Sequence, residues 1–334
     1  LFGTNNFPDC SNMCHESSGV GMGEAIATGK GTVTLEDFEK ADAIFVFGQN
    51  PGTNHPRMLS ELEKASKRGA RIVSFNPLKE AGLLNFTHPQ NAVDMLLGRS
   101  TPISSHYYQV QIGGDMAAVR AMAKFILEKA ESDRSVLDHD FLERHTHGFE
   151  EYRRLVAETP WEVLLEESGL DRRQIEEAAE VYLGAGSVIC CWAMGLTQHR
   201  HGVANIQEVV NLLLLRGNIG RPGAGACPVR GHSNVQGDRT MGITEEPKEE
   251  FLASLEKESG FTAPRHHGYS TVHTIKAMAE GRVGFFLGMG GNFASATPDS
   301  DLTWQALRRC GMTVHVSTHL NRSHVVHGEA ALIL

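Results

Sequence analysis

The feature that most constrains the fold is a strand–helix–strand pattern within residues 41–77. Residues 43–47 read AIFVF and residues 71–75 read RIVSF, two short apolar runs typical of buried strands. The apolar residues that recur between them at helical spacing are Met58, Leu59, Leu62 and Ala65. Gly69 ends this predicted helix. Two buried strands joined by one helix form a β–α–β crossover, and such a crossover requires a parallel sheet.

The same alternation recurs along the chain. Further strands are predicted at 187–193, 283–287 and 312–316, further helices at 203–215, 271–279 and 299–310, and another helix behind Gly113-Gly114 with Asp115 as its N-cap. Residues 330–334 resemble one more buried strand. We therefore predict the α/β class, as two doubly wound, mostly parallel-sheet (Rossmann-like) domains. The first spans residues 1–232 and the second, cut short at its C-terminal end, spans residues 233–334.

Composition excludes several classes of protein. The 334 residues include 31 Lys and Arg against 40 Asp and Glu, a net charge of −9, with no basic segment, so we expect no nucleic-acid partner. No apolar run approaches membrane-spanning length and no signal peptide is evident, so we expect no membrane insertion and a cytoplasmic protein with reduced cysteines. Because the chain starts at Leu1, we interpret it as an internal piece of a longer polypeptide.

Four loops carry the residues expected to bind a ligand. In open α/β sheets, ligands bind where loops leave the carboxyl ends of the strands. Loops rich in Gly, Asn and small polar residues occur at 48–55, 76–77, 194–201 and 288–295, and we expect them on one rim. Each loop alone is better explained as a tight turn, but four such loops on one rim favour a ligand site. No G-x-x-x-x-G-K-[ST] motif is present, which excludes a P-loop enzyme.

Residues 9–19, DCSNMCHESSG, place Cys10, Cys14 and His15 together. The C-x-x-x-C-H spacing does not fit covalent haem, which needs C-x-x-C-H. Structural zinc needs four ligands, but Cys190 and Cys191 are adjacent on a strand and would point to opposite faces. A cysteine nucleophile, two buried cysteines without a role, and a single thiolate that binds a cofactor-held redox metal remain open.

Together these segments resemble the molybdopterin oxidoreductases of the dimethyl sulfoxide reductase superfamily, in particular formate dehydrogenase alpha subunits. The matching segments are DCSNMCHESSG, VFGQNPGTNHPRM, NPLKE, GGDMAA, CWAMGLTQHRHG, LLLLRGNIGRPGAGACPVRGHSNVQG and GMGGNF, in the family's order. The resemblance implies the central domains of such an enzyme. It also implies a molybdenum (or tungsten) ion held by two molybdopterin guanine dinucleotides, with Cys14 as its protein ligand.

The resemblance further assigns catalytic roles to Cys14, His15 and Arg230. His15 would move the substrate proton, and the planar fork of Arg230 would bind a substrate carboxylate. The implied cofactor-binding residues are Gly48, Asn50, His55, Asn76, Pro77, Gly113, Asp115, Met194, Gly195, Gln198, His232, Asn234, Gly290 and Asn292. The implied reaction is the two-electron oxidation of formate or a related small oxyacid.

At three positions this sequence differs from the family, and these differences concern the identity of the substrate rather than the cofactor. His232 stands where well-known formate dehydrogenases have glutamine, Leu78 where they have arginine, and Asn76 where they have aspartate. The alternatives are a non-catalytic domain like that of a complex I subunit, or a reductase of the same superfamily. A small-molecule substrate is expected, the electron-transfer partner is unspecified, and a 4Fe–4S cluster is expected only in the full-length protein. The isolated piece is expected to be inactive.

Overall fold

The computed structural model describes residues 3–334, which form two compact units. The larger unit is Cys14–Ser233, and the smaller one combines residues 3–13 with Asn234–Leu334. The division thus lies one residue beyond the expected boundary, but residues 3–13 group with the smaller unit. There the backbone N–H of Thr271 donates to Asn12 Oδ1 at 3.1 Å and its hydroxyl donates to the Asp9 carbonyl at 3.1 Å. The assignment of the two functional domains stays a prediction.

A five-stranded, wholly parallel sheet forms the centre of the larger unit, in the order β5-β2-β1-β6-β7. Its strands are β1 (Ala43–Phe47), β2 (Arg71–Phe75), β5 (His106–Tyr108), β6 (Val188–Trp192) and β7 (Gly225–Pro228). The chain runs from β1 outward to β2 and β5, then returns to β6 beside β1 and continues to β7. The direction of winding therefore reverses between β1 and β6, which makes their carboxyl ends the expected ligand site.

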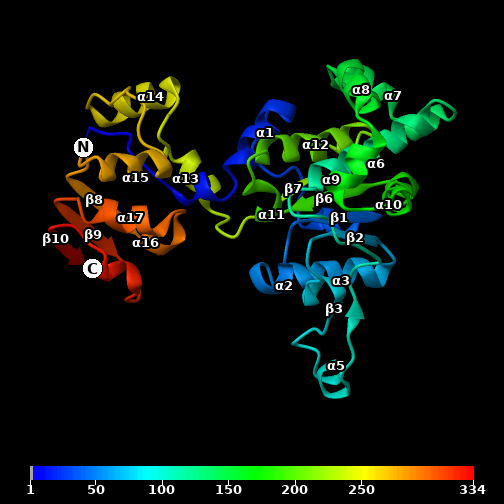
Figure 1. Ribbon diagram of the computed structural model, residues 1–334, viewed down its shortest axis with the longest axis horizontal. Helices are drawn as coiled ribbons and strands as arrows, with labels where there is room; N and C mark the ends of the chain where they lie inside the picture. Colours follow the sequence, from blue (N-terminus) through cyan, green and yellow to red (C-terminus); the bar gives the residue numbers. More distant parts are fainter. Residues whose placement is uncertain (1–2) are drawn as a thin grey trace. The chain divides into compact units, whose positions relative to one another are not determined.

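Helices cover both faces of this sheet (Figure 1). One face packs against α1 (Glu16–Ile26), α6 (Asp115–Ala130), α9 (Trp161–Ser168), α10 (Arg172–Gly184) and α12 (Gly202–Leu214). The other packs against α3 (Met58–Arg68), α4 (Ala81–Leu84) and η2 (Glu36–Glu39). Cys190 lies in the first core and Cys191 in the second, which confirms that they point to opposite faces. The predicted α/β class with parallel sheets is confirmed.

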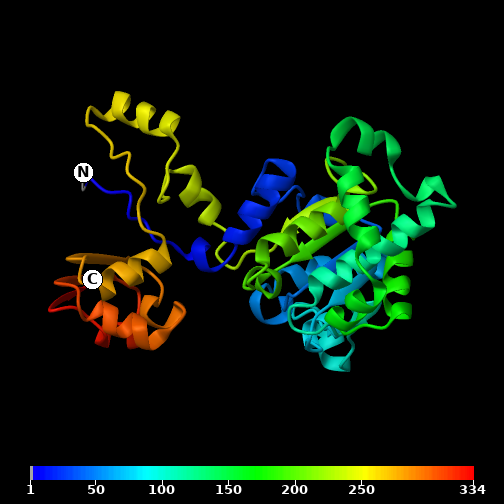
Figure 2. The same ribbon diagram turned by 45° about the horizontal axis from the view of Figure 1, so that its top comes forward.

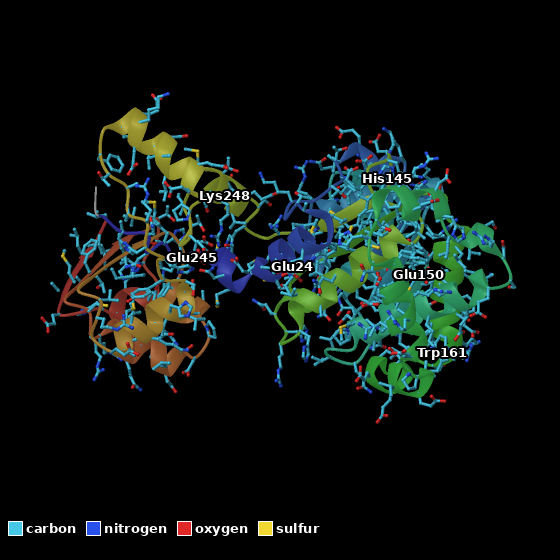
Figure 3. All side chains as sticks on the ribbon, turned by 90° about the horizontal axis from the view of Figure 1, so that it is seen from above. Glu24, His145, Glu150, Trp161, Glu245 and Lys248 are labelled. Carbon is cyan, nitrogen blue, oxygen red and sulfur yellow. The ribbon has the colours of Figure 1, made fainter. Side chains whose placement is uncertain are left out.

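Short elements complete the larger unit. They are α2 (Pro51–Asn54), β3 (Asn85–Phe86), α5 (Ala92–Leu97), β4 (Thr101–Pro102), η3 (Arg134–Val136), α7 (His139–His145), α8 (Phe149–Glu158) and α11 (Met194–Thr197). Strands β3 and β4 form an antiparallel pair. Helices α1 and α12 lie side by side (Figure 1). Gln207 Nε2 of α12 donates a 2.7 Å hydrogen bond to Oε2 of Glu24 on α1, the residue labelled in Figure 3.

The smaller unit contains a three-stranded parallel sheet in the order β10-β9-β8. Its elements are η1 (Cys10–Met13), α13 (Val235–Thr240), α14 (Glu249–Ser259), α15 (Thr271–Ala279), β8 (Phe285–Met289), α16 (Phe293–Ala296), α17 (Ser300–Leu307), β9 (Met312–Val316), η4 (Arg322–Val325) and β10 (Ala330–Ile333). Helices α15 and α17 share one core with Phe286 of β8. In Figure 2 these helices are drawn in orange beside the red C-terminal strands of the same unit. The last strand was expected to be buried; β10 forms at one edge of the sheet, but its residues are exposed.

Two local expectations need correction. Asp115 is the first residue of α6 rather than its N-cap; Gly114 takes the cap position, where a Cβ would lie 2.5 Å from the Glu167 carbonyl oxygen. The four Gly- and Asn-rich loops do not share one sheet edge. The first three follow β1, β2 and β6 of the larger sheet, whereas residues 290–295 follow β8 in the smaller sheet.

Candidate functional site at the carboxyl edge of the larger sheet

Cys14 lies at the winding reversal of the larger sheet. Its half-buried Sγ atom is 3.7 Å from Met194 Sδ at the start of α11, and its backbone carbonyl accepts a 2.7 Å hydrogen bond from the Thr197 hydroxyl. Burial raises the pKa of the Cys14 thiol, whereas Arg230 and the backbone of Gly231 act to lower it. Residues far apart in sequence thus place one soft sulfur ligand beside a guanidinium.

His15 is almost fully buried and both of its ring nitrogens have partners. Nδ1 is 2.8 Å from Ser18 Oγ, and Nε2 is 3.2 Å from the Val229 carbonyl. Because a carbonyl can only accept, Nε2 carries the ring proton and donates it to Val229. In the neutral ring Nδ1 is then the acceptor of the Ser18 hydroxyl, whose oxygen also accepts from the Trp192 indole at 2.9 Å. Burial, followed by the charge of Arg230, lowers the pKa of His15 to about 4.

Arg230 and His55 face the same region. Arg230 Nη2 donates to the Gly29 carbonyl at 2.8 Å, while its Nε is buried without a protein partner. His55 Nδ1 is 3.3 Å from Gln49 Nε2, and His55 Nε2 is also buried without a protein partner. Burial lowers the pKa of both side chains. Two donors of this edge are therefore still available to a ligand.

Gly48 and Gly195 touch backbone to backbone. A Cβ on Gly195 would lie 2.5 Å from Gly48 Cα, and one on Gly48 would lie 2.8 Å from Gly195 Cα. The Gly195 N–H also donates to the Gly48 carbonyl at 3.0 Å, and Gly48 has a positive φ of 52°. In this structure both glycines allow the loop after β1 to contact α11.

Asn50 and Asn76 hold neighbouring loops together. Asn50 caps α2 by accepting from the Thr53 N–H at 3.1 Å and donates to Glu80 at 2.6 Å. Buried Asn76 donates to the Gln49 carbonyl at 3.0 Å, and the next residue, Pro77, accepts from Gln109 at 3.0 Å. These two asparagines thus already have protein partners.

Gly113 and Asp115 follow β5 at the same sheet edge. Gly113 has a φ of 87°, a left-handed conformation that favours glycine. Asp115 is 4% exposed, and its Oδ1 has no protein partner. Burial raises the pKa of this carboxyl to about 7. An acceptor kept away from water at the start of a long helix is suited to a ligand that donates hydrogen bonds.

The remaining predicted residues divide between the two units. Gln198 and His232 are exposed in the larger unit, while Asn234, Gly290 and Asn292 belong to the smaller unit. Asn292 precedes α16 and its side chain bonds the Ser323 hydroxyl. Sequence reasoning missed Ser18, Trp192 and Gln49. For Trp192 a clue existed, because an indole N–H at the end of a buried strand needs an acceptor.

Within residues 3–334, no three His, Cys, Asp or Glu side chains gather as a metal-binding group. The described part of the chain also contains no helix of sufficient length and apolarity to cross a membrane. A family model described as molybdopterin oxidoreductase matches residues 3–326. The chain belongs to the molybdopterin oxidoreductase family. The predicted resemblance is thereby confirmed at the family level.

Several proteins are similar to this molybdopterin oxidoreductase. An uncharacterized oxidoreductase of Mycobacterium tuberculosis (strain ATCC 25618 / H37Rv) is 55% identical over 334 residues, which is 100% of this chain and 43% of the relative. Protein YdeP of Escherichia coli K12 is 50% identical over 338 residues, covering 100% of this chain and 44% of YdeP. Formate dehydrogenase H of Escherichia coli K12 is 29% identical over 295 residues, which is 85% of this chain and 38% of the relative. The chain thus spans less than half the length of these curated relatives.

Acetylene hydratase from Pelobacter acetylenicus has a similar solved structure, with a TM-score of 0.68 and 18% identity over 94% of this chain and 43% of that one. This similarity concerns the fold. The family implies a molybdenum or tungsten pterin cofactor, and the residues present fit such a group. Cys14 offers a soft ligand, and the buried atoms that lack protein partners at this edge are Gln49 Oε1, His55 Nε2, Asp115 Oδ1 and Arg230 Nε.

Proposed function

We propose that this molybdopterin oxidoreductase is formate dehydrogenase-like and catalyses the two-electron oxidation of formate or a related small oxyacid. The observation that carries the proposal is the pairing of Cys14 with Arg230, whose guanidinium lies close enough to lower the pKa of the Cys14 thiol. A soft metal ligand and a carboxylate-binding fork are thereby adjacent. The 29% identity to formate dehydrogenase H gives further support.

The proposed cofactor is a molybdenum or tungsten ion with two molybdopterin guanine dinucleotides, and Cys14 as its protein ligand. When bound, this group would accept the two electrons of the substrate and pass them to a 4Fe–4S cluster outside this chain. Asp115, Asn76 and Gly113 are proposed to hold one dinucleotide. Gly290 and Asn292 are proposed to hold the other, together with the remaining loop residues named above.

The proposed roles of the chain's own residues follow from their bonding. Arg230 would bind the substrate carboxylate with the donors that the Gly29 carbonyl leaves open. His15 would accept a substrate proton at Nδ1, the ring nitrogen that has no proton of its own. Because Nδ1 already accepts a hydrogen bond from the Ser18 hydroxyl, that bond has to break first. Until that bond opens, His15 positions Arg230 through the neighbouring Val229 carbonyl.

The test uses the full-length protein, produced with cofactor and compared with Cys14→Ser and Arg230→Lys variants. Metal analysis of wild type should find molybdenum or tungsten, and a screen of formate and other small oxyacids should find turnover. Arg230→Lys keeps the charge but loses the fork, so we expect retained metal and a KM raised about 10- to 100-fold, the value of a charged hydrogen bond. Cys14→Ser should lose turnover.

If the protein is metal-free when purified from cells in which other molybdenum enzymes receive their cofactor, the proposal is contradicted. That result would favour a non-catalytic structural domain. Turnover only in the direction of oxo-acceptor reduction would contradict the oxidation and favour a reductase. An unchanged KM in Arg230→Lys would show that Arg230 does not bind the substrate.

A further inference from the structure

Cys191 and Cys227 occupy paired positions on neighbouring strands outside the site described above. In the register of β6 and β7, Cys191 lies opposite Cys227. Adjacent strands are about 4.8 Å apart, and paired residues of parallel strands point to the same face. Cys191 belongs to the core on the α3 face, and Cys227 packs against that same core. The two thiols therefore face each other.

The two side chains are close enough to interact. Cys227 acts, together with burial, to raise the pKa of the Cys191 thiol. A disulfide needs Cα atoms roughly 4.4–6.8 Å apart and Cβ vectors that converge on one side, and paired positions on these strands satisfy the first condition without movement of the backbone. Cys190, by contrast, is paired with Ala226 on the opposite face. The geometry thus selects one pair of thiols.

This pair lies one residue before the carboxyl ends of β6 and β7, next to the candidate site. Three residues beyond Cys191 the chain reaches Met194, which contacts Cys14. Three residues beyond Cys227 it reaches Arg230, whose guanidinium interacts electrostatically with both Cys227 and Cys14. A covalent link between the strands would therefore join the two segments that position Met194 and Arg230.

We propose that Cys191 and Cys227 form a redox-active dithiol that closes to a disulfide and thereby fixes the β6–β7 pair beneath the site. The oxidant is a small-molecule disulfide, such as glutathione disulfide. Partly exposed Cys227 loses its proton and attacks one glutathione sulfur, which releases one glutathione thiol and leaves a mixed disulfide. The Cys191 sulfur then loses its proton and attacks the Cys227 sulfur, which releases the second glutathione.

The balance is two cysteine thiols oxidised and one glutathione disulfide reduced to two thiols. Burial raises the pKa of the Cys191 thiol well above its ordinary value, so Cys227 rather than Cys191 makes the first attack. Neither step involves a metal or a substrate, so the proposal stands independently of the proposed function.

The experiment titrates the full protein with glutathione disulfide, blocks remaining thiols with a maleimide, and maps the cysteines by peptide mass spectrometry. We expect the Cys191 and Cys227 thiols to disappear together, with a peptide that joins them. In Cys191→Ala the reaction should stop at glutathione on Cys227. In Cys227→Ala, Cys191 should remain reduced, because it is buried and no longer has a partner.

Cys310→Ala is the matched control, since Cys310 is also a fully buried thiol but lies in the smaller unit. This variant should form the Cys191–Cys227 bond at the same oxidant concentration as wild type. The proposal is overturned if wild type accumulates glutathione on Cys227 without loss of the Cys191 thiol. It is equally overturned if Cys191 and Cys227 both stay reduced after Cys14 has reacted.

Discussion

The Nδ1 atom of His15 lies 2.8 Å from the hydroxyl of Ser18, and this hydroxyl is itself the acceptor of the Trp192 indole. All three side chains are at most 2% exposed. The histidine next to the proposed metal ligand is therefore a fixed part of the core in this structure. Its orientation depends on Ser18 and on the Val229 carbonyl.

Ser18→Ala tests this dependence. The substitution leaves both the Trp192 N–H and His15 Nδ1 buried without a partner, so we expect the free energy of unfolding to fall by about 2–4 kcal/mol. Urea unfolding of the cofactor-free protein measures it. Ser17→Ala removes a single 3.1 Å bond to the Thr197 carbonyl and should cost only about 1 kcal/mol. If the free energy of unfolding fell equally in the two variants, the stability would not depend on the hydrogen bonds that Ser18 makes with His15 and Trp192.

Gly195→Ala should destabilise the protein by about 2–3 kcal/mol. The added Cβ would lie 2.5 Å from Gly48 Cα, and backbone cannot move aside as a flexible side chain does. Gly23→Ala in α1 is the control, because a Cβ there meets nothing within 4 Å. Thermal unfolding should show Gly23→Ala stabilised by about 0.5–1 kcal/mol, since alanine favours a helix interior. A neutral Gly195→Ala would contradict the close contact.

Asp115→Asn should stabilise the cofactor-free protein in a pH-dependent way. Burial raises the pKa of Asp115 from 3.8 to about 7, so between these values the unfolded chain has lost a proton that the folded chain keeps. The free energy of unfolding of the wild type therefore falls as pH rises through this window and stays constant above it. The total decrease is roughly 4 kcal/mol. Asparagine does not ionise.

The advantage of Asp115→Asn over wild type should accordingly be about 2–3 kcal/mol larger at pH 8 than at pH 5. Denaturant unfolding at both pH values measures this difference. A constant difference would show that the carboxyl is ionised throughout.

The ion pair between partly buried Arg120 and buried Glu208 provides a fourth prediction. Arg120 Nη2 donates to Glu208 at 2.9 Å, and the Tyr152 hydroxyl donates to the other carboxylate oxygen at 2.7 Å. Glu208→Leu leaves the partly buried Arg120 guanidinium unpaired and removes the acceptor of the Tyr152 hydroxyl, so we expect a loss of about 3–5 kcal/mol in chemical unfolding. The double variant Arg120→Met, Glu208→Leu should recover the part that comes from the unpaired charge, while the loss of the Tyr152 hydrogen bond remains.

The exposed pair of Arg153 with Glu150 on α8 is the control for this prediction (Figure 3). Glu150→Ala should change the free energy of unfolding by less than about 1 kcal/mol, because exposed ion pairs are screened by solvent. If the Arg120–Glu208 double variant is as unstable as Glu208→Leu alone, the unpaired charge is not the cause.

The sequence predicted the longer, apolar elements well. Strands β1, β2 and β9 have the expected bounds or nearly so, and α15 spans the predicted residues 271–279. Strands β5 and β7 were missed because they are only three and four residues long and have no apolar run. Their strand conformation comes from pairing with β2 and β6, which a local pattern does not contain.

Local sequence alone did not predict which side chains meet in the site. Cys14 and Met194 are 180 residues apart, and their contact follows from the winding reversal between β1 and β6. The family resemblance supplied Arg230 and His15. The bonding that fixes His15 involves a serine and a tryptophan, two residue types that occur in any core, so no motif marks them.

The contact between Gly48 and Gly195 has a consequence for how this edge can vary. No side chain separates the loop after β1 from α11, so rotamer changes do not alter the distance between them. That spacing is set by peptide geometry and by one main-chain hydrogen bond. For a ligand at the winding reversal this backbone spacing would thus be constant, and adaptation to another ligand would have to come from the side chains around it.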